Sequence, residues 1–248
     1  MSEVALVTGG ARRIGRAIVE RLAEAGYAVA IHCGSARAEA EALAAGIQQR
    51  GGHAAVVSAD LADPVGVDAL LPAAEAALGP VTLLVNNASS FLVDDVTSID
   101  VPTWNRQFSI NLRAPSVLAG ALANRLPNGR HGAIVNIIDQ RVWKLTPQYY
   151  SYTLTKAALL TATKTMAQAL APRIRVNAVG PGPTLPNPHD GAEAMEHEAA
   201  ATLLGRRIDA GEIADAVLYL AQARSVTGQM IAVDGGQHLG WRTPDIID

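Results

Sequence analysis

The sequence is poor in cysteine and in long apolar runs, and these absences exclude several classes of protein. Its 248 residues include one cysteine, Cys33, so intrachain disulfides are excluded and a reducing, cytoplasmic environment is expected. The longest apolar runs, such as residues 81–85, are far shorter than the roughly 18 residues that a membrane-spanning helix needs. The first residues lack the basic and apolar regions of a secretory signal, so we expect neither a leader nor a membrane partner.

The charge of the chain is nearly balanced. Twenty basic and 23 acidic residues give a net charge of −3, which provides no overall field that would draw the chain onto nucleic acid. A hydrophobic content of 49% excludes an acidic disordered chain and predicts a sizeable core. Because α/β chains of about 250 residues often fold as one unit, we expect residues 1–248 to form a single domain.

Short aliphatic runs alternate with longer segments of helical periodicity. In the first such segment, Ile14, Ile18 and Leu22 share one helical face. Alternating strands and helices require right-handed crossovers, so we predict an α/β fold: a doubly wound, mostly parallel sheet of seven strands with helices on both faces. The predicted strands cover residues 4–7, 28–31, 54–57, 83–85, 133–138, 175–179 and 230–233.

The Pro/Gly-rich stretch 180–191 is the longest segment without a clear period. It follows the end of a predicted strand, where open α/β sheets bind their ligands. We therefore predict a mobile substrate loop over about residues 181–205, with a plain surface connection as the alternative. This loop and the segment 140–148 are expected to line the side where the distal part of a substrate lies.

A glycine-rich turn, Thr8 to Gly15, joins the first predicted strand to the first helix. Glycine lets a backbone turn tightly and approach a phosphate, and the free N–H groups at a helix start attract anions. A pair of glycines after a strand is also compatible with a tight turn alone. The context nevertheless indicates a dinucleotide site.

The end of the second predicted strand indicates which dinucleotide is bound. A chain that prefers NAD places Asp or Glu there for the ribose hydroxyls, but residues 31–35 contain no carboxylate. Arg12, Ser35 and Arg37 are candidates to hold a 2′-phosphate, although Arg37 also fits a solvated helix charge. We therefore predict NADPH/NADP+ as the cofactor.

Tyr152 and Lys156 lie four residues apart in a helical segment, so they share one face. A nearby ammonium favours the phenolate, so Lys156 is expected to lower the pKa of Tyr152 and to make it a proton donor near neutral pH. The pair alone is common. It gains specificity beside the glycine-rich turn, the run Asn86–Ala88, Asn111 and Asp60.

With these motifs the sequence resembles the short-chain dehydrogenase/reductase family, over nearly the whole chain to the stretch 226–236. The resemblance implies a Rossmann-like subunit in which Tyr152 is the acid, Lys156 holds the nicotinamide ribose and Asn111 supports a proton-relay water. It places Asp60 near the adenine and Asn87 near the adjoining ribose, and Asp60 also fits a helix cap. The full expected cofactor set is Gly9, Arg12, Arg13, Ile14, Gly15, His32, Ser35, Asp60, Leu61, Asn87, Ala88, Ser89, Tyr152, Lys156, Pro181 and Gly182.

One residue departs from the family pattern. Thirteen residues before Tyr152, most members carry a serine that binds the substrate carbonyl, whereas this chain has Asp139. A carboxylate repels a developing oxyanion but suits a ring that presents N–H groups, such as a pterin. The alternative is that Asp139 only pairs with Arg13 or Arg141.

Further residues resemble the pteridine reductase branch, which includes bacterial dihydromonapterin reductases: Arg13, Ser89, Phe91 and the run 234–239. In that branch the residues that match Arg13 and Ser89 contact both ligands, and the one that matches Phe91 stacks on the pterin. The resemblance implies NADPH-dependent reduction of a dihydropterin or folate-like substrate, with Asp139 and Tyr152 also contacting it. The alternatives are a ketone reductase of the same family and a non-catalytic NADP-binding regulator.

The family resemblance also implies a homotetramer built through two long helices, here residues 104–126 and 152–170. The six histidines show no metal-ligand spacing, so no metal is expected.

Overall fold

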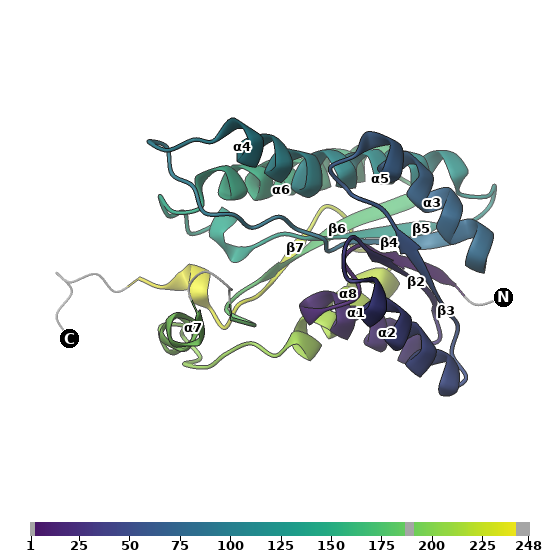
Figure 1. Cartoon of the computed structure of the whole chain (residues 1–248), viewed down its shortest axis with the longest axis horizontal. Helices are drawn as coiled ribbons and strands as arrows, with labels where there is room; N and C mark the ends of the chain where they lie inside the picture. Colours follow the sequence, from purple (N-terminus) through teal and green to yellow (C-terminus); the bar gives the residue numbers. More distant parts are fainter. Residues whose placement is uncertain (1–2, 187–190, 242–248) are drawn as a thin grey trace.

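The computed structural model describes residues 3–186 and 191–241 (Figure 1). Its centre is a parallel sheet with the strand order β3-β2-β1-β4-β5-β6-β7, so the predicted doubly wound fold is confirmed. The central strands are buried and mostly aliphatic, as parallel strands covered on both faces require, whereas the two edge strands are partly exposed. They are β1 (Val4–Val7), β2 (Ala28–Cys33), β3 (Ala54–Ser58), β4 (Val81–Asn86), β5 (Gly132–Ile137), β6 (Ile174–Pro181) and β7 (Met230–Val233).

Two layers of helices cover the sheet. Helices α1, α2 and α8 pack on one face, and α3, α4, α5 and α6 pack on the other (Figure 1). Each layer encloses its own apolar core, the first around Ile18 and Leu22 and the second around Leu71 and Leu122. The helices are α1 (Arg13–Glu24), α2 (Arg37–Gln49), α3 (Pro64–Leu78), α4 (Val101–Phe108), α5 (Ala114–Arg125), α6 (Tyr150–Leu170), α7 (Gly191–Ala200) and α8 (Ala210–Gln222).

The predicted single helix over residues 104–126 is wrong. The structure has α4, a π-helical turn at Ser109–Arg113, and α5. Pro115 explains the break, because proline has no N–H to donate to the carbonyl four residues earlier, which is that of Asn111. The π turn thus places Asn111 at an irregular point, as such turns often do at functional sites.

The predicted loop over 181–205 is also not wholly a loop. Residues 191–200 form α7, rich in alanine and glutamate, which have high helix propensity. Helix α7 lies beyond the carboxyl ends of the strands, beside the C-terminal segment (Figure 1). Residues 187–190, part of the predicted mobile loop, lie outside the described residues.

The strand order reverses between β2-β1 and β4-β5, and in open α/β sheets ligands bind outside the strand ends at such a point. Most strands begin or end one or two residues away from the predicted limits, and β5 ends at Ile137 rather than at residue 138. Within the described ranges, no helix combines the length and apolar character needed to cross a membrane.

Candidate active site

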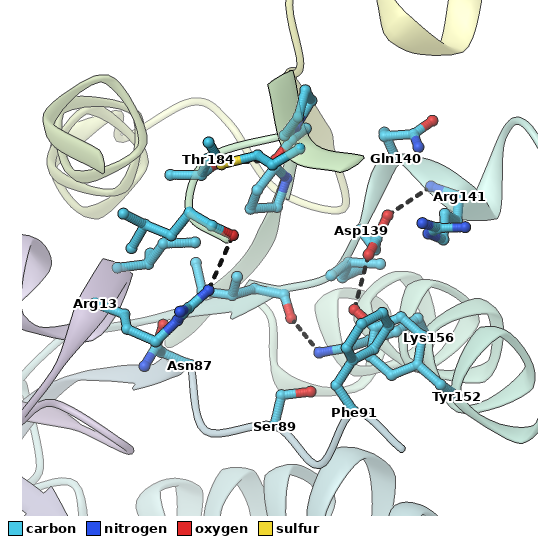
Figure 2. Close-up of a pocket in the computed structure, with 18 of the residues that line it drawn as sticks. Arg13, Asn87, Ser89, Phe91, Asp139, Gln140, Arg141, Tyr152, Lys156 and Thr184 are labelled. Atoms are coloured by element: carbon cyan, nitrogen blue, oxygen red, sulfur yellow. Dashed lines mark hydrogen bonds between the residues drawn. The ribbon is translucent and has the colours of Figure 1, made fainter. Parts of the chain in front are cut away.

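A cavity of about 600 Å³ opens at the carboxyl ends of β1, β4, β5 and β6. Figure 2 shows Arg13 and Asn87 on one side of it and Asp139, Tyr152 and Lys156 on the other. Residues from α7 also line it. The cavity brings together most of the predicted site: Gly9, Arg12, Arg13, Ile14, Gly15, Asn87, Ala88, Ser89, Phe91, Asp139, Tyr152, Lys156, Pro181 and Gly182.

The glycine-rich turn is compact and braced from β4. Gly9 has φ +61°, and a Cβ at Gly15 would overlap the Gly9 carbonyl oxygen. Asn87 Nδ2 donates to the carbonyls of Thr8 at 2.9 Å and of Gly9 at 3.0 Å, and Thr8 Oγ1 accepts from the Asn87 N–H at 3.0 Å. Only glycine fits these positions, so the backbone of the turn is held open for a close ligand.

The imidazole ring of His32 stabilises the glycine-rich turn through hydrogen bonds. Its Nδ1 accepts from the Gly9 N–H at 3.1 Å, so Nε2 carries the proton and donates to the Ala59 carbonyl at 3.1 Å. Burial lowers the pKa of His32, which keeps the ring neutral. Both ring nitrogens are therefore bonded to the protein, and His32 also lines the smaller of two cavities at this end of the sheet, so its predicted cofactor contact stays a prediction.

The start of α1 has the features of an anion site. Its first turn contains no acidic residue, and the Arg12 side chain caps no N–H there. The arginines beside it point to protein partners: Arg12 pairs with the Glu39 carboxylate, and Arg13 donates to the carbonyls of Leu185 at 3.1 Å and Pro186 at 2.9 Å (Figure 2). Arg13 itself adopts φ +55°, a left-handed conformation rare outside glycine.

A smaller cavity of about 360 Å³ adjoins the first one and is lined by Ser35, Asp60 and Leu61. Asp60 pairs with Arg106 at 3.7 Å. Asp63 rather than Asp60 caps α3, so the helix-cap alternative for Asp60 is wrong. The alternative for Arg37 fits the structure, because Arg37 pairs with Glu41 along its own exposed helix.

The opposite wall holds a phenol and a carboxylate in direct contact. The Tyr152 hydroxyl donates to Asp139 Oδ2 at 2.8 Å, and Asp139 Oδ1 accepts from the backbone N–H of Arg141 at 2.8 Å (Figure 2). Tyr152 is buried, and Asp139 is partly exposed. Withdrawal from solvent raises the pKa of Asp139. The alternative pairing of Asp139 with Arg13 is wrong, and Arg141 meets Asp139 through its backbone.

Lys156 lies behind the phenol ring rather than at its hydroxyl. Its Nζ donates to the Ile137 carbonyl at 2.9 Å and stands 5.6 Å from the Tyr152 ring centroid. Burial lowers the pKa of Lys156 to about 8. Burial and the negative charge of Asp139 raise the pKa of Tyr152 well above its usual value, so the predicted lowering by Lys156 is wrong for this state of the site.

Asn111 is buried behind the residues that line the cavity. Its amide donates to the Ser90 carbonyl at 2.8 Å and to Thr155 Oγ1 at 3.1 Å, and its Oδ1 accepts from the Ser90 N–H at 2.7 Å. The Ser89 hydroxyl donates to the same Oδ1 at 3.2 Å. Asn111 thus ties the segment after β4 to α6 and does not line the cavity itself.

The rings of Phe91, Tyr149 and Tyr152 pack together as an aromatic wall. Phe91 stacks on Tyr149 at 4.2 Å between centroids and meets the edge of Tyr152 at 4.5 Å. Arg141 lies over the Tyr149 ring at 5.4 Å. Sequence reasoning missed Tyr149, the Glu39 partner of Arg12, and Glu198 on α7, because contacts between distant segments leave no local pattern.

Comparison with known proteins identifies the family of the chain. The family model described as Enoyl-(Acyl carrier protein) reductase matches residues 9–238. The chain belongs to the short-chain dehydrogenase/reductase family. The predicted family is therefore confirmed, and this short-chain dehydrogenase/reductase is an oxidoreductase by membership.

Similar proteins differ in the activities that their names give. The crystal structure of FolM alternative dihydrofolate reductase 1 from Brucella suis, in complex with NADP, is 52% identical, with a TM-score of 0.96 over 99% of this chain and 98% of that chain. The NADPH-dependent aldehyde reductase-like protein of Arabidopsis thaliana is 34% identical over 94% of this chain and 93% of its own length. The 3-oxoacyl-(acyl-carrier-protein) reductase FabG of Staphylococcus aureus is 32% identical over 96% and 99%.

Proposed function

We propose that this protein reduces a 7,8-dihydropterin to the tetrahydropterin with NADPH. The observation that carries the proposal is Asp139, held by the Tyr152 hydroxyl and the Arg141 N–H at the cavity wall. A carboxylate in this position accepts hydrogen bonds from an amino-substituted heteroaromatic ring and disfavours a developing oxyanion. It therefore favours a pterin over a simple ketone.

The site fits a dinucleotide phosphate. A Cβ at Gly15 would overlap the Gly9 carbonyl oxygen, and a Cβ at Gly182 would overlap the backbone of Asp234 after the neighbouring strand β7, so the backbone is closely packed at both positions. The N–H groups at the start of α1 would hold the pyrophosphate, and Arg12 with Ser35 would hold the 2′-phosphate. NADP is named in the structure of the Brucella suis relative, which supports this cofactor. When bound, NADPH supplies a hydride, here to C6 of the dihydropterin.

The chain's own residues then supply the proton and the alignment. Tyr152 donates a proton toward N5 of the pterin, and Lys156 stabilises the phenolate that remains. Asp139 orients the ring through its N–H groups and supports the proton relay together with Asn111. Burial and the charge of Asp139 raise the pKa of Tyr152, and the positive charge of an oxidised nicotinamide would act in the opposite direction.

The other side of the pterin is held by residues that are already in place. Phe91 lies edge-on to Tyr152, in position to stack on a flat ring. Ser89 and Arg13 reach the cavity from the turn side and would contact both ligands. The FolM name of the Brucella suis relative supports a pterin or folate substrate.

A ketone or aldehyde substrate is the second candidate, because the FabG and aldehyde reductase relatives are named for such activities. The deciding experiment follows NADPH oxidation with dihydromonapterin, dihydrobiopterin and dihydrofolate beside a panel of ketones, with the Tyr152→Phe protein as the blank. Turnover of pterins supports the proposal. Turnover confined to ketones overturns it and leaves the family membership unchanged.

We further propose that the protein is a cytoplasmic homotetramer assembled through α4–α5 and α6. Apolar side chains on these helices, such as Val117 and Leu154, are exposed at 37% and 36%. Light scattering on the purified protein tests the stoichiometry, and a monomer at micromolar concentration would contradict it.

A further inference from the structure

A second charged group, Arg141, lines the cavity two residues after Asp139. The Arg141 side chain is 14% exposed and lies over the Tyr149 ring, whose plane is nearly parallel to that of Phe91. Its Nη1 donates to Thr146 Oγ1 at 3.3 Å. The guanidinium thus lies beside the aromatic wall and lines the cavity, where it would face the side chain of a pterin bound as proposed.

The partner of this cation comes from α7. Glu198 lies 3.5 Å from Arg141 Nη2, and its side chain is 45% exposed. Ala194, Met195 and Glu198 occur at helical spacing and line the cavity together, whereas Glu196 is exposed and belongs to the other side of the helix. Glu198 therefore presents a carboxylate to the cavity and neutralises Arg141.

We propose that Glu198 is a specificity-determining residue that makes this site prefer a pterin with an uncharged, hydroxylated side chain over one that carries carboxylates. The inference rests on the proposed pterin reduction and deepens it. An anionic tail has to displace Glu198 from Arg141 or remain beside its negative charge, and like charges in one site are costly. A polyol instead finds two acceptor oxygens on Glu198.

Three other cations of the cavity are bonded to protein groups and are not placed to pair with the carboxylates of a substrate's side chain. Arg13 donates to the carbonyls of Leu185 and Pro186, and Lys156 donates to the Ile137 carbonyl deep behind Tyr152. Arg12 lies on the far side, at the glycine-rich turn, paired with Glu39. Beside Asp139, which is bonded to Tyr152 and to the Arg141 N–H, the pairing of Arg141 with Glu198 sets the charge at the mouth of the aromatic wall.

The test compares kcat/KM for dihydromonapterin, whose tail is an uncharged polyol, with kcat/KM for dihydrofolate, whose glutamate carries two carboxylates. Glu198→Gln keeps the size of the side chain and removes its charge. We expect the dihydrofolate-to-dihydromonapterin ratio to rise about five- to tenfold, mainly through a lower KM for dihydrofolate. Glu196→Gln makes the same change on the same helix outside the cavity, and its ratio should stay within about twofold of wild type.

Two further measurements exclude a merely structural effect of the substitution. The rise in the dihydrofolate-to-dihydromonapterin ratio caused by Glu198→Gln should become smaller as the salt concentration is raised, because charges at this partly exposed site are screened. It should also disappear in the double variant Glu198→Gln/Arg141→Met, which removes the cation.

An unchanged or lower ratio in Glu198→Gln, or an equal rise in Glu196→Gln, would overturn the inference while leaving pterin reduction in place. A wild-type protein that reduces neither pterin would overturn the proposed function and this inference together.

Discussion

The two long walls of the cavity are built differently. On the wall from β5 and α6, Tyr152 and Lys156 are 6% and 2% exposed and each is bonded to a fixed neighbour. On the wall from the start of α1, the Arg12 side chain is 57% exposed and its partner Glu39 is 45% exposed. A buried group that loses its hydrogen-bond partner finds no water to take that partner's place. An exposed charge is screened by solvent and can pair with another group instead. Substitutions should therefore cost orders of magnitude on the first wall and small factors on the second.

The largest effect is expected for Tyr152→Phe on the buried wall. The change removes the proposed proton donor and leaves the ring, so turnover should fall by about 10²- to 10⁴-fold with little change in cofactor affinity. Steady-state kinetics together with titration of NADPH fluorescence measure both quantities. Turnover equal to wild type would reject Tyr152 as the acid.

Gly15→Ala tests whether the exposed wall is tolerant throughout. A Cβ at this position would overlap the Gly9 carbonyl and approach Asn87 Nδ2 at 2.6 Å, so the turn must distort. We expect NADPH to bind at least about tenfold more weakly, because backbone displacement near a ligand is costly. This loss of affinity would show that the backbone of the exposed wall is rigid, whereas its arginine side chains adapt to a ligand.

Gly46→Ala is the matched control for that variant. Gly46 lies inside α2, and its added Cβ would meet only Arg50 Nη1 at 3.6 Å. Alanine in a helix interior is favoured over glycine by roughly 0.5–1 kcal/mol, so this variant should unfold at a slightly higher temperature and bind NADPH normally. Calorimetric titration of both variants compares them directly, and equal NADPH affinities would contradict the proposed tight turn.

A smaller effect is expected in the pH dependence of the buried wall. Lys156, with a pKa lowered to about 8, loses its positive charge as the pH rises through that value, so kcat/KM should fall above about pH 8. The charge of Asp139 raises the pKa values of both Lys156 and Tyr152. Asp139→Asn removes that charge, so kcat/KM should begin to fall at a lower pH than in the wild type. A fall that begins at the same or a higher pH would show that Asp139 is not coupled to the titrating groups.

The features predicted from the sequence are those with a local pattern. Buried parallel strands give aliphatic runs, a tight turn before a helix gives glycines, and four-residue spacing places Tyr152 and Lys156 on one face. Asp139 was identified because it departs from the family's pattern. Its bond to the Tyr152 hydroxyl was not predicted, because it depends on how the end of β5 meets α6 in three dimensions.

What was missed depends on contacts between distant parts of the chain. Glu39 pairs with Arg12 across 27 residues, and Glu198 pairs with Arg141 across 57. The absence of a carboxylate at the end of β2 therefore did not mean that the 2′-phosphate site lacks one, since Glu39 reaches the region from α2. The pKa of Tyr152 was misjudged for a related reason: a spacing of four shows that Lys156 is near, but not that Asp139 is nearer.

We expect the smallest effect for Glu39→Gln, which changes a charge on the exposed wall. Glu39 pairs with Arg12, so a 2′-phosphate bound as proposed would compete with Glu39 for Arg12. Removing the carboxylate should tighten NADPH by about two- to fivefold at low salt, and NADH, which has no 2′-phosphate, should change less. Glu41→Gln is the matched control, because Glu41 pairs with Arg37 on the same helix. If Glu39→Gln instead weakened NADPH, the carboxylate would be orienting Arg12 rather than competing for it, and this wall would be as preorganised as the buried one.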